Sequence, residues 1–188
     1  LLLLYRSGFA GYDNPTLHGI YDLAYLRGVP NLRLCYPKDR FEAERMVREE
    51  LRALSGPTAI LMPYGPAEEI DEAVALETSE SFALPEVDYI GCELVLCTVG
   101  NRYRAALEAV EALRARGVDA GLVNLRYLKP LPEAFLAEEL RDARRIVTLE
   151  EGVLEGGVGS ALAALAADHG LLAEWLRIGL PCTFVEPG

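Results

Sequence analysis

Short apolar runs alternate with amphipathic segments along the first third of the chain. Three of these runs, at residues 1–5, 32–36 and 58–62, have the length of buried β-strands. Between the second and the third, apolar positions recur at helical spacing over residues 39–54, and an Asp-x-x-Glu pair marks the start of this helix. A shorter helix is predicted over residues 20–27. Strands that alternate with helices in this way predict a parallel sheet covered on both faces.

The alternation lapses and then returns in the second half of the chain. Residues 66–89 are rich in acidic residues, alanine, serine and proline, which predicts a linker. Later strands are expected at residues 94–99, 120–125, 145–149 and 175–178, and helices at residues 102–116, 132–143 and 160–168. We therefore expect an α/β protein with a first domain at residues 1–65 and a second, compact α/β domain at residues 90–188.

Side chains that could do chemistry gather in the loop after the first predicted strand. This loop holds Asp13, Thr16 and His18, one of the two histidines of the chain. Loops beyond the carboxyl ends of parallel strands carry the ligands of α/β proteins, so we expect the function here. His18 suits acid–base work near neutral pH, and Asp13 could bond to a substrate hydroxyl or keto group. The alternatives are a structural imidazole for His18 and a loop-shaping turn residue for Asp13.

The composition limits the classes of partner. A net charge of −11 argues against non-specific nucleic-acid binding, which needs a basic face. No apolar run reaches the ~18 residues of a membrane span, so we expect a cytoplasmic protein with no nucleic-acid or membrane partner. The four cysteines form no CxxC pair and are expected to be buried reduced thiols, and we expect no metal site. The chain begins without Met inside an apolar run, which suggests a piece of a longer protein.

Five short motifs follow one another along nearly the whole chain. They are Asp13-x-x-Thr16-x-x-Gly19-x-x-Asp22-Leu23-x-Tyr25-Leu26-Arg27, Arg126-Tyr127-Leu128-Lys129-Pro130-Leu131, Thr148-Leu149-Glu150-Glu151, Gly156-Gly157-x-Gly159-Ser160 and Ile178-Gly179-Leu180-Pro181. In this order they resemble the 1-deoxy-D-xylulose-5-phosphate synthase family, which belongs to the transketolase-like thiamine-diphosphate enzymes. The resemblance implies the late half of a pyrimidine-binding parallel-sheet domain, followed by a transketolase C-terminal α/β domain.

The resemblance implies that the chain is part of a transferase. Enzymes of the family use thiamine diphosphate to decarboxylate pyruvate and pass the two-carbon unit to an aldehyde such as glyceraldehyde 3-phosphate, in isoprenoid precursor and thiamine biosynthesis. Their magnesium and diphosphate site lies in an N-terminal domain that this chain lacks, and the glutamate that activates thiamine also lies upstream. A homodimer that acts on a small-molecule substrate is therefore expected, and this chain alone is expected to be inactive.

The resemblance also assigns candidate site residues. Arg6 and Asp13 match residues that contact the substrate in the family. The family histidine after the loop threonine is replaced by Leu17, and His18 follows one place later. The family's phosphate-binding arginine is replaced by Tyr64, whose hydroxyl can donate one hydrogen bond. We therefore predict catalytic roles for His18 and Asp13. Substrate binding is predicted for Arg6, Asp13 and Tyr64, with an ion pair as the alternative for Arg6.

Other interpretations stay open at this point. The β subunit of a 2-oxo acid dehydrogenase shares the two-domain layout, and a non-catalytic transketolase-like module would explain the loss of the histidine and the arginine. The glycine-rich turn at residues 156–160 could attract an anion at a helix N-terminus or could simply pack tightly. Glu150 and Glu151 could be acid–base carboxylates, but a structural or interface role is favoured because the sequence shows no partner for them.

Overall fold

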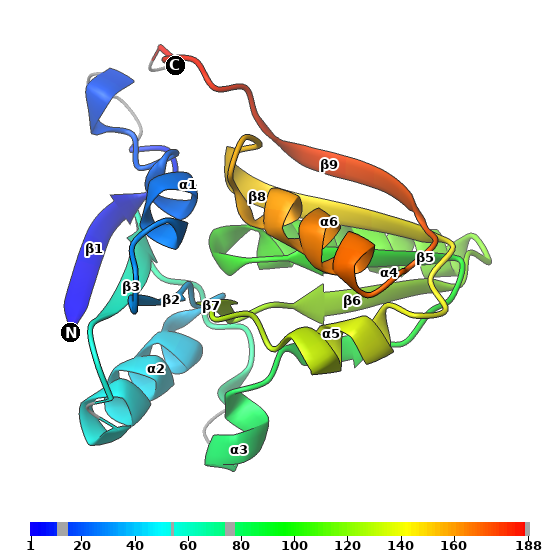
Figure 1. Ribbon diagram of the computed structural model, residues 1–188, viewed down its shortest axis with the longest axis horizontal. Helices are drawn as coiled ribbons and strands as arrows, with labels where there is room; N and C mark the ends of the chain where they lie inside the picture. The colour runs from blue at the N-terminus through cyan, green and yellow to red at the C-terminus, as the bar shows by residue number, and fades with distance from the viewer. Residues whose placement is uncertain (11–14, 54, 74–77, 187–188) are drawn as a thin grey trace.

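The computed structural model describes residues 1–10, 15–53, 55–73 and 78–186. Its strands form two sheets that lie beside each other (Figure 1). The first sheet has the order β1-β3-β2-β7 and consists of β1 (Leu2–Ser7), β3 (Thr58–Pro63), β2 (Arg33–Cys35) and β7 (Tyr127–Lys129). Strands β1, β3 and β2 are parallel, whereas β7 runs antiparallel to β2.

The second sheet has the order β4-β6-β5-β8-β9. It consists of β4 (Glu86–Tyr89), β6 (Ala120–Asn124), β5 (Leu94–Thr98), β8 (Arg145–Val153) and β9 (Glu174–Leu180). Only the edge strand β4 is antiparallel to its neighbour in this sheet, and the other pairs are parallel. The predicted α/β fold with parallel sheets is therefore confirmed.

Helices cover both faces of the second sheet. The helices are α1 (Asp22–Arg27), α2 (Arg40–Ala53), α3 (Ser79–Phe82), α4 (Tyr103–Ala115), α5 (Glu133–Glu139) and α6 (Val158–Asp168), with 3-10 turns η1 (Pro15–Leu17) and η3 (Gly100–Arg102). Helix α6 lies in front of the sheet and α4 behind it (Figure 1). Neighbouring strand residues point to opposite faces, so Leu96 joins the core cluster of Val110 on α4, while Val95 joins that of Leu162 on α6.

Helix α2 begins where the sequence predicts. The carboxylate of Asp39 accepts a hydrogen bond from the backbone N–H of Glu42 at 2.8 Å. The carboxylate of Glu42 in turn accepts one from the backbone N–H of Lys38 at 2.7 Å. Because the first N–H groups of a helix have no partner within it, these side chains satisfy donors that burial would otherwise leave unpaired.

One hydrophobic core runs from the first sheet into the second. Leu34 and Leu61 of the first sheet belong to the same buried cluster as Val123 of the second sheet and Leu136 of α5. Strand β7 strengthens this connection, since it follows β6 in the chain but pairs with β2. The sequence predicts no strand there, because three residues are too few to show a periodicity. The proposed boundaries at residues 65 and 90 stay a prediction.

Two predictions about burial are wrong. Strand β1 forms, but Leu2, Leu3 and Tyr5 are each more than half exposed, because β1 is an edge strand that pairs only with β3 in the described structure. An apolar run predicts a strand, but it does not show whether a second strand covers its outer edge. The cysteines are all free, with Cys35 and Cys97 buried and Cys92 and Cys182 exposed.

A group of polar and charged side chains is buried between the two sheets. This junction cluster consists of Lys38, Glu42, Glu86, Asn124 and Arg126. The carboxylate of Glu42 accepts hydrogen bonds from Nε of Arg126 at 2.6 Å and from the side-chain amide of Asn124 at 3.1 Å. Glu86 lies 2.5 Å from Nζ of Lys38 and 3.3 Å from a terminal nitrogen of Arg126. Each buried charge thus has an opposite charge within reach, which is the condition for burying it without a large penalty.

Candidate functional site

Two predicted substrate-binding residues meet at the carboxyl edge of the first sheet. Arg6 lies near the end of β1, and Tyr64 directly follows β3. The guanidinium carbon of Arg6 is 5.5 Å from the centroid of the Tyr64 ring, a cation–π contact. The pairing of β1 with β3 shifts between Tyr5 and Ser7, and Arg6 has a φ of 72°. Irregularities of this kind change the direction in which side chains point at the ends of strands.

His18 fastens the loop that follows β1. The residue is 5% exposed, and its Nδ1 accepts a hydrogen bond from the backbone N–H of Ala10 at 3.0 Å. Its ring meets the ring of Phe9 edge-on, with centroids 5.2 Å apart. Because Nδ1 is an acceptor, the proton of the neutral imidazole resides on Nε2. Within the described part of the chain, Nε2 has no hydrogen-bond partner, so His18 offers one N–H donor.

Three other loop positions bear on the predicted site. Leu17, which the resemblance places where a histidine is expected, lies in η1 and is 47% exposed. Asp13 lies outside the described residues, so its catalytic and substrate-binding roles stay predictions. A Cβ on Gly19 would lie 2.5 Å from the backbone oxygen of Arg6, so only glycine lets the loop return this closely to the end of β1.

Glu151 of β8 connects this loop to the second sheet. One carboxylate oxygen accepts a hydrogen bond from the backbone N–H of Phe9 at 3.0 Å. The other oxygen lies 2.8 Å from a terminal nitrogen of Arg102 and accepts a hydrogen bond from the side-chain amide of Asn101. Glu151 therefore has an interface role, which is the role that the sequence favoured over acid–base chemistry.

Glu150 points to a different structure, the N-terminus of α6. Its carboxylate accepts hydrogen bonds from the backbone N–H groups of Val158 at 2.8 Å and Gly159 at 2.9 Å. A Cβ on Gly157 would lie 2.5 Å from the same carboxylate. The anion at this glycine-rich turn is thus a side chain of the protein itself, and tight packing explains the glycines. Burial raises the pKa of Glu150, and the two backbone donors oppose this rise.

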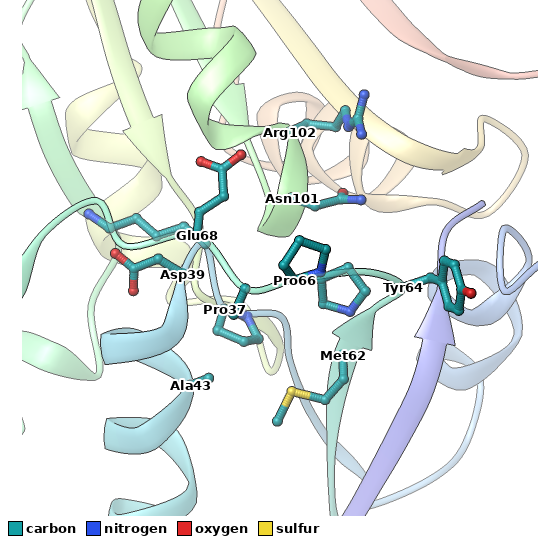
Figure 2. A pocket seen from close by; sticks show the side chains of 12 residues that line it. Pro37, Asp39, Ala43, Met62, Tyr64, Pro66, Glu68, Asn101 and Arg102 are labelled. Atoms are coloured by element: carbon teal, nitrogen blue, oxygen red, sulfur yellow. The ribbon is translucent and has the colours of Figure 1, made fainter. Parts of the chain in front are cut away.

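A cavity of about 210 Å³ lies between the first sheet and η3. Residues that line it include Lys38, Met62, Tyr64, Glu68, Asn101 and Arg102. Figure 2 shows that the side chains of Tyr64, Asn101 and Arg102 extend toward the same side of this region. Asn101 and Arg102 were not among the site residues predicted from the sequence. They follow Gly100 just after strand β5, so the rule that pointed to the first loop would also have found them.

The described residues form no evident metal site. Across the ranges that the structure covers, no three His, Cys, Asp or Glu side chains are placed so that they could hold a metal ion. None of the helices within those ranges combines the length and the apolar character that a membrane span requires. The charged groups beside the cavity are arginine, lysine and carboxylate side chains, an arrangement that suits recognition of a charged small molecule.

Comparisons with known proteins agree with this architecture. The chain is 40% identical to a 1-deoxy-D-xylulose-5-phosphate synthase of Geobacillus thermodenitrificans, over 97% of this chain and 29% of that protein. It is 37% identical to a synthase of the same name from Bacteroides fragilis, over 97% of this chain and 28% of that protein. The chain thus spans less than a third of the length of these curated relatives.

A solved structure named "Split gene transketolase, inactive beta4 tetramer" has a TM-score of 0.82 and 25% identity to this chain. The match covers 98% of this chain and 57% of that one. Residues 1–66 match the family model "Transketolase, pyrimidine binding domain". Residues 85–188, more than half of the chain, match the model "Transketolase, C-terminal domain". The chain therefore belongs to the transketolase family.

Proposed function

We propose that this chain is the substrate-side part of a thiamine-diphosphate-dependent transferase that passes a two-carbon unit from pyruvate to an aldehyde such as glyceraldehyde 3-phosphate. Relatives that match nearly the whole chain are named 1-deoxy-D-xylulose-5-phosphate synthase. The observation that carries the proposal is the meeting of Arg6 with Tyr64 beside a small cavity at the carboxyl edge of a parallel sheet. Such a place suits a small anionic substrate, and isoprenoid precursor synthesis is the role that we assign to the whole protein.

The described residues are better suited to bind the substrate than to bind the diphosphate and metal ion of the cofactor. They form no cluster of metal ligands, and the cavity of about 210 Å³ is smaller than the roughly 300 Å³ from which sites for larger ligands begin. We therefore place thiamine diphosphate and magnesium in other parts of a longer protein. When bound, thiamine diphosphate supplies the carbon nucleophile and the electron sink for decarboxylation.

The residues of this chain bind and orient the substrate in this proposal. Arg6 holds an anionic group through its planar fork of N–H donors, and the Tyr64 ring supports the guanidinium. Asp13 accepts a hydrogen bond from a substrate hydroxyl. His18 acts through its Nε2–H as a donor, because its Nδ1 already accepts the hydrogen bond from the backbone N–H of Ala10.

A non-catalytic module is the second candidate, and one observation favours it. The position of the family histidine is occupied by Leu17, a side chain that is 47% exposed and cannot transfer a proton. The similar solved structure is named an inactive tetramer, which is a property of that protein. In this second proposal the chain keeps the scaffold for assembly with another subunit. The relatives named as synthases give less support to a 2-oxo acid dehydrogenase β subunit.

The deciding experiment uses the full-length protein that contains this chain. Carbon dioxide release from pyruvate is measured with and without thiamine diphosphate, and with and without glyceraldehyde 3-phosphate. We expect release that requires the cofactor and increases with the aldehyde. Release equal to that of a protein-free sample would favour the non-catalytic module, and activity with unphosphorylated aldehydes alone would show a changed acceptor.

We also propose a cytoplasmic homodimer. The similar split-gene transketolase is named a tetramer, which supports self-association of proteins with this fold. Light scattering on the full-length protein at micromolar concentration is expected to give twice the mass of one chain. A single-chain mass would remove the homodimer from the proposal.

A further inference from the structure

The two cations among the described residues that line the cavity differ in their contacts. Lys38 is buried, and its Nζ lies 2.5 Å from Glu86 and 3.8 Å from Asp71. The side chain of Arg102 is 41% exposed, and a terminal nitrogen pairs with Glu151 at 2.8 Å. A guanidinium group has five N–H donors in a plane, so the pairing with Glu151 leaves donors for a second anion. Of these two cations, Arg102 is the one that can take a ligand.

The position of Arg102 is set by a nearly buried carboxylate. Glu151, whose side chain is 7% exposed, contacts Arg102, the Asn101 amide and the backbone N–H of Phe9. The same carboxylate therefore orients Arg102 and holds the loop that carries the predicted substrate residues. A cation held in this way loses little conformational freedom when a ligand binds, which favours affinity.

The surroundings of Arg102 also suit an anion. Tyr64 lines the same cavity as Arg102 and contacts Arg6 through its ring. Helix α4 begins directly after Arg102 and has no acidic residue in its first turn. No carboxylate of this turn therefore offsets the partial positive charge at the N-terminus of the helix. Figure 2 shows the side chains of Asn101 and Arg102 extending from neighbouring positions in the same direction.

We propose that Arg102, with Asn101 beside it, forms the subsite that binds the phosphate of the aldehyde acceptor. This inference rests on the proposed function and adds a specificity-determining residue from η3, the turn that follows strand β5 of the second sheet. Tyr64 contributes at most one hydrogen bond, so Arg102 supplies the charge that Tyr64 lacks. The recognised chemistry is a phosphate monoester on a small aldehyde.

The test compares two variants of the full-length enzyme that remove the same charge. Arg102→Gln removes the proposed contact, and Arg116→Gln removes an exposed cation from the other end of α4. We expect Arg102→Gln to raise the KM for glyceraldehyde 3-phosphate about 10- to 100-fold, because a hydrogen bond to a charged group is lost. The KM values for unphosphorylated glyceraldehyde and for pyruvate should change less than about twofold, as should all three values in Arg116→Gln.

Several results would overturn the inference. They are equal changes for the phosphorylated and unphosphorylated aldehydes, a change in the KM for pyruvate alone, and no change at all. A change in the KM for pyruvate alone would mean that Arg102 binds the carboxylate of pyruvate. Arg102→Lys should recover part of the affinity, since it restores the charge without the planar fork.

A binding measurement separates this inference from the proposed function. Calorimetric titration with inorganic phosphate should show binding to the full-length protein, unchanged in Arg116→Gln and about tenfold weaker in Arg102→Gln. Thermal unfolding of each variant, followed by circular dichroism, shows whether a loss of phosphate binding is caused by unfolding of the protein. If no aldehyde supports thiamine-dependent activity but phosphate binding depends on Arg102, the proposed reaction fails and the anion subsite remains. If the enzyme is active and both variants bind phosphate equally, the subsite is wrong.

Discussion

The junction cluster and the candidate site join the same two sheets with the same kinds of residue. In the junction cluster Glu42 and Arg126 are 0% and 1% exposed. Arg126 is held by the carboxylates of Glu42 and Glu86, and Glu42 also accepts a hydrogen bond from the amide of Asn124. In the site Arg102 also pairs with a nearly buried glutamate, but its side chain is 41% exposed. An ion pair whose hydrogen-bonding groups all have partners within the protein stabilises the fold. An ion pair with donors left over can still bind a ligand. The following changes test that difference, from the largest expected effect on stability to the smallest.

Arg126→Met should destabilise the protein by about 3–5 kcal/mol, because it leaves the carboxylate of Glu42 buried without its nearest cation. Urea unfolding of the full-length protein measures this loss. Arg145→Gln is the matched control, since it breaks an ion pair with Glu174 that is exposed on both sides and should cost about 0–1 kcal/mol. Equal losses in the two variants would show that the junction cluster is not the stabilising feature.

The stability contributed by Glu42 should fall as the pH rises. Burial raises the pKa of Glu42 from 4.5 to about 7, against the opposing effect of Arg126. Between these two pH values the folded protein binds more protons than the unfolded chain, so the free energy of unfolding decreases with pH. The contribution is fully present below pH 4.5, and on the order of 3 kcal/mol is lost by the time the pH has passed 7.

Glu42→Gln removes this titration and keeps the shape of the side chain. The difference in unfolding free energy between the natural protein and Glu42→Gln should therefore decrease from pH 4.5 to pH 7.5. Asp88 contributes in the same direction, because burial raises its pKa from 3.8 to about 6, but this contribution is common to both proteins and cancels. A difference that is independent of pH would contradict the assignment to Glu42.

Glu151→Ala should loosen the loop at the candidate site with little effect on the junction cluster. Loss of the carboxylate leaves the backbone N–H of Phe9 without its acceptor, so the exchange of this amide hydrogen should become about tenfold faster. Glu155→Ala, which removes an exposed carboxylate four residues later, should leave the exchange unchanged. Unchanged exchange in Glu151→Ala would mean that the second sheet does not hold the loop.

Leu17→His should have the smallest effect on stability, less than about 0.5 kcal/mol, because the side chain is 47% exposed. It introduces a proton-transfer group at the position where the resemblance to the synthase family implies a histidine. In the proposed transferase, kcat should rise by about tenfold or more, as measured by carbon dioxide release from pyruvate in the full-length protein. No gain in a folded variant would favour the non-catalytic module over the transferase.

Local patterns in the sequence determined the order and type of most elements. The helix over residues 40–53 and the strand at 58–63 were predicted closely, because the period of apolar positions and the pairing of Asp39 with Glu42 act within a few residues. The same holds for the placing of candidate residues after strands. The carboxyl-end rule pointed to the loop after β1, whereas Arg6 and Tyr64 came from the resemblance to the synthase family. The same rule would have found Arg102 if applied to the second sheet.

Only the tertiary structure decided which distant residues meet. Glu151 binds the backbone of Phe9 across 142 positions of the chain, and Arg126 binds Glu42 across 84. It also decided that β7 completes the first sheet and that β1 is exposed at its edge. Each of these outcomes depends on the packing of segments far apart in sequence, and a local hydrophobic period carries no information about such partners. The sequence therefore showed which chemistry a single side chain can do. Only the fold decided whether that side chain is fully paired within the protein or still has donors for a ligand.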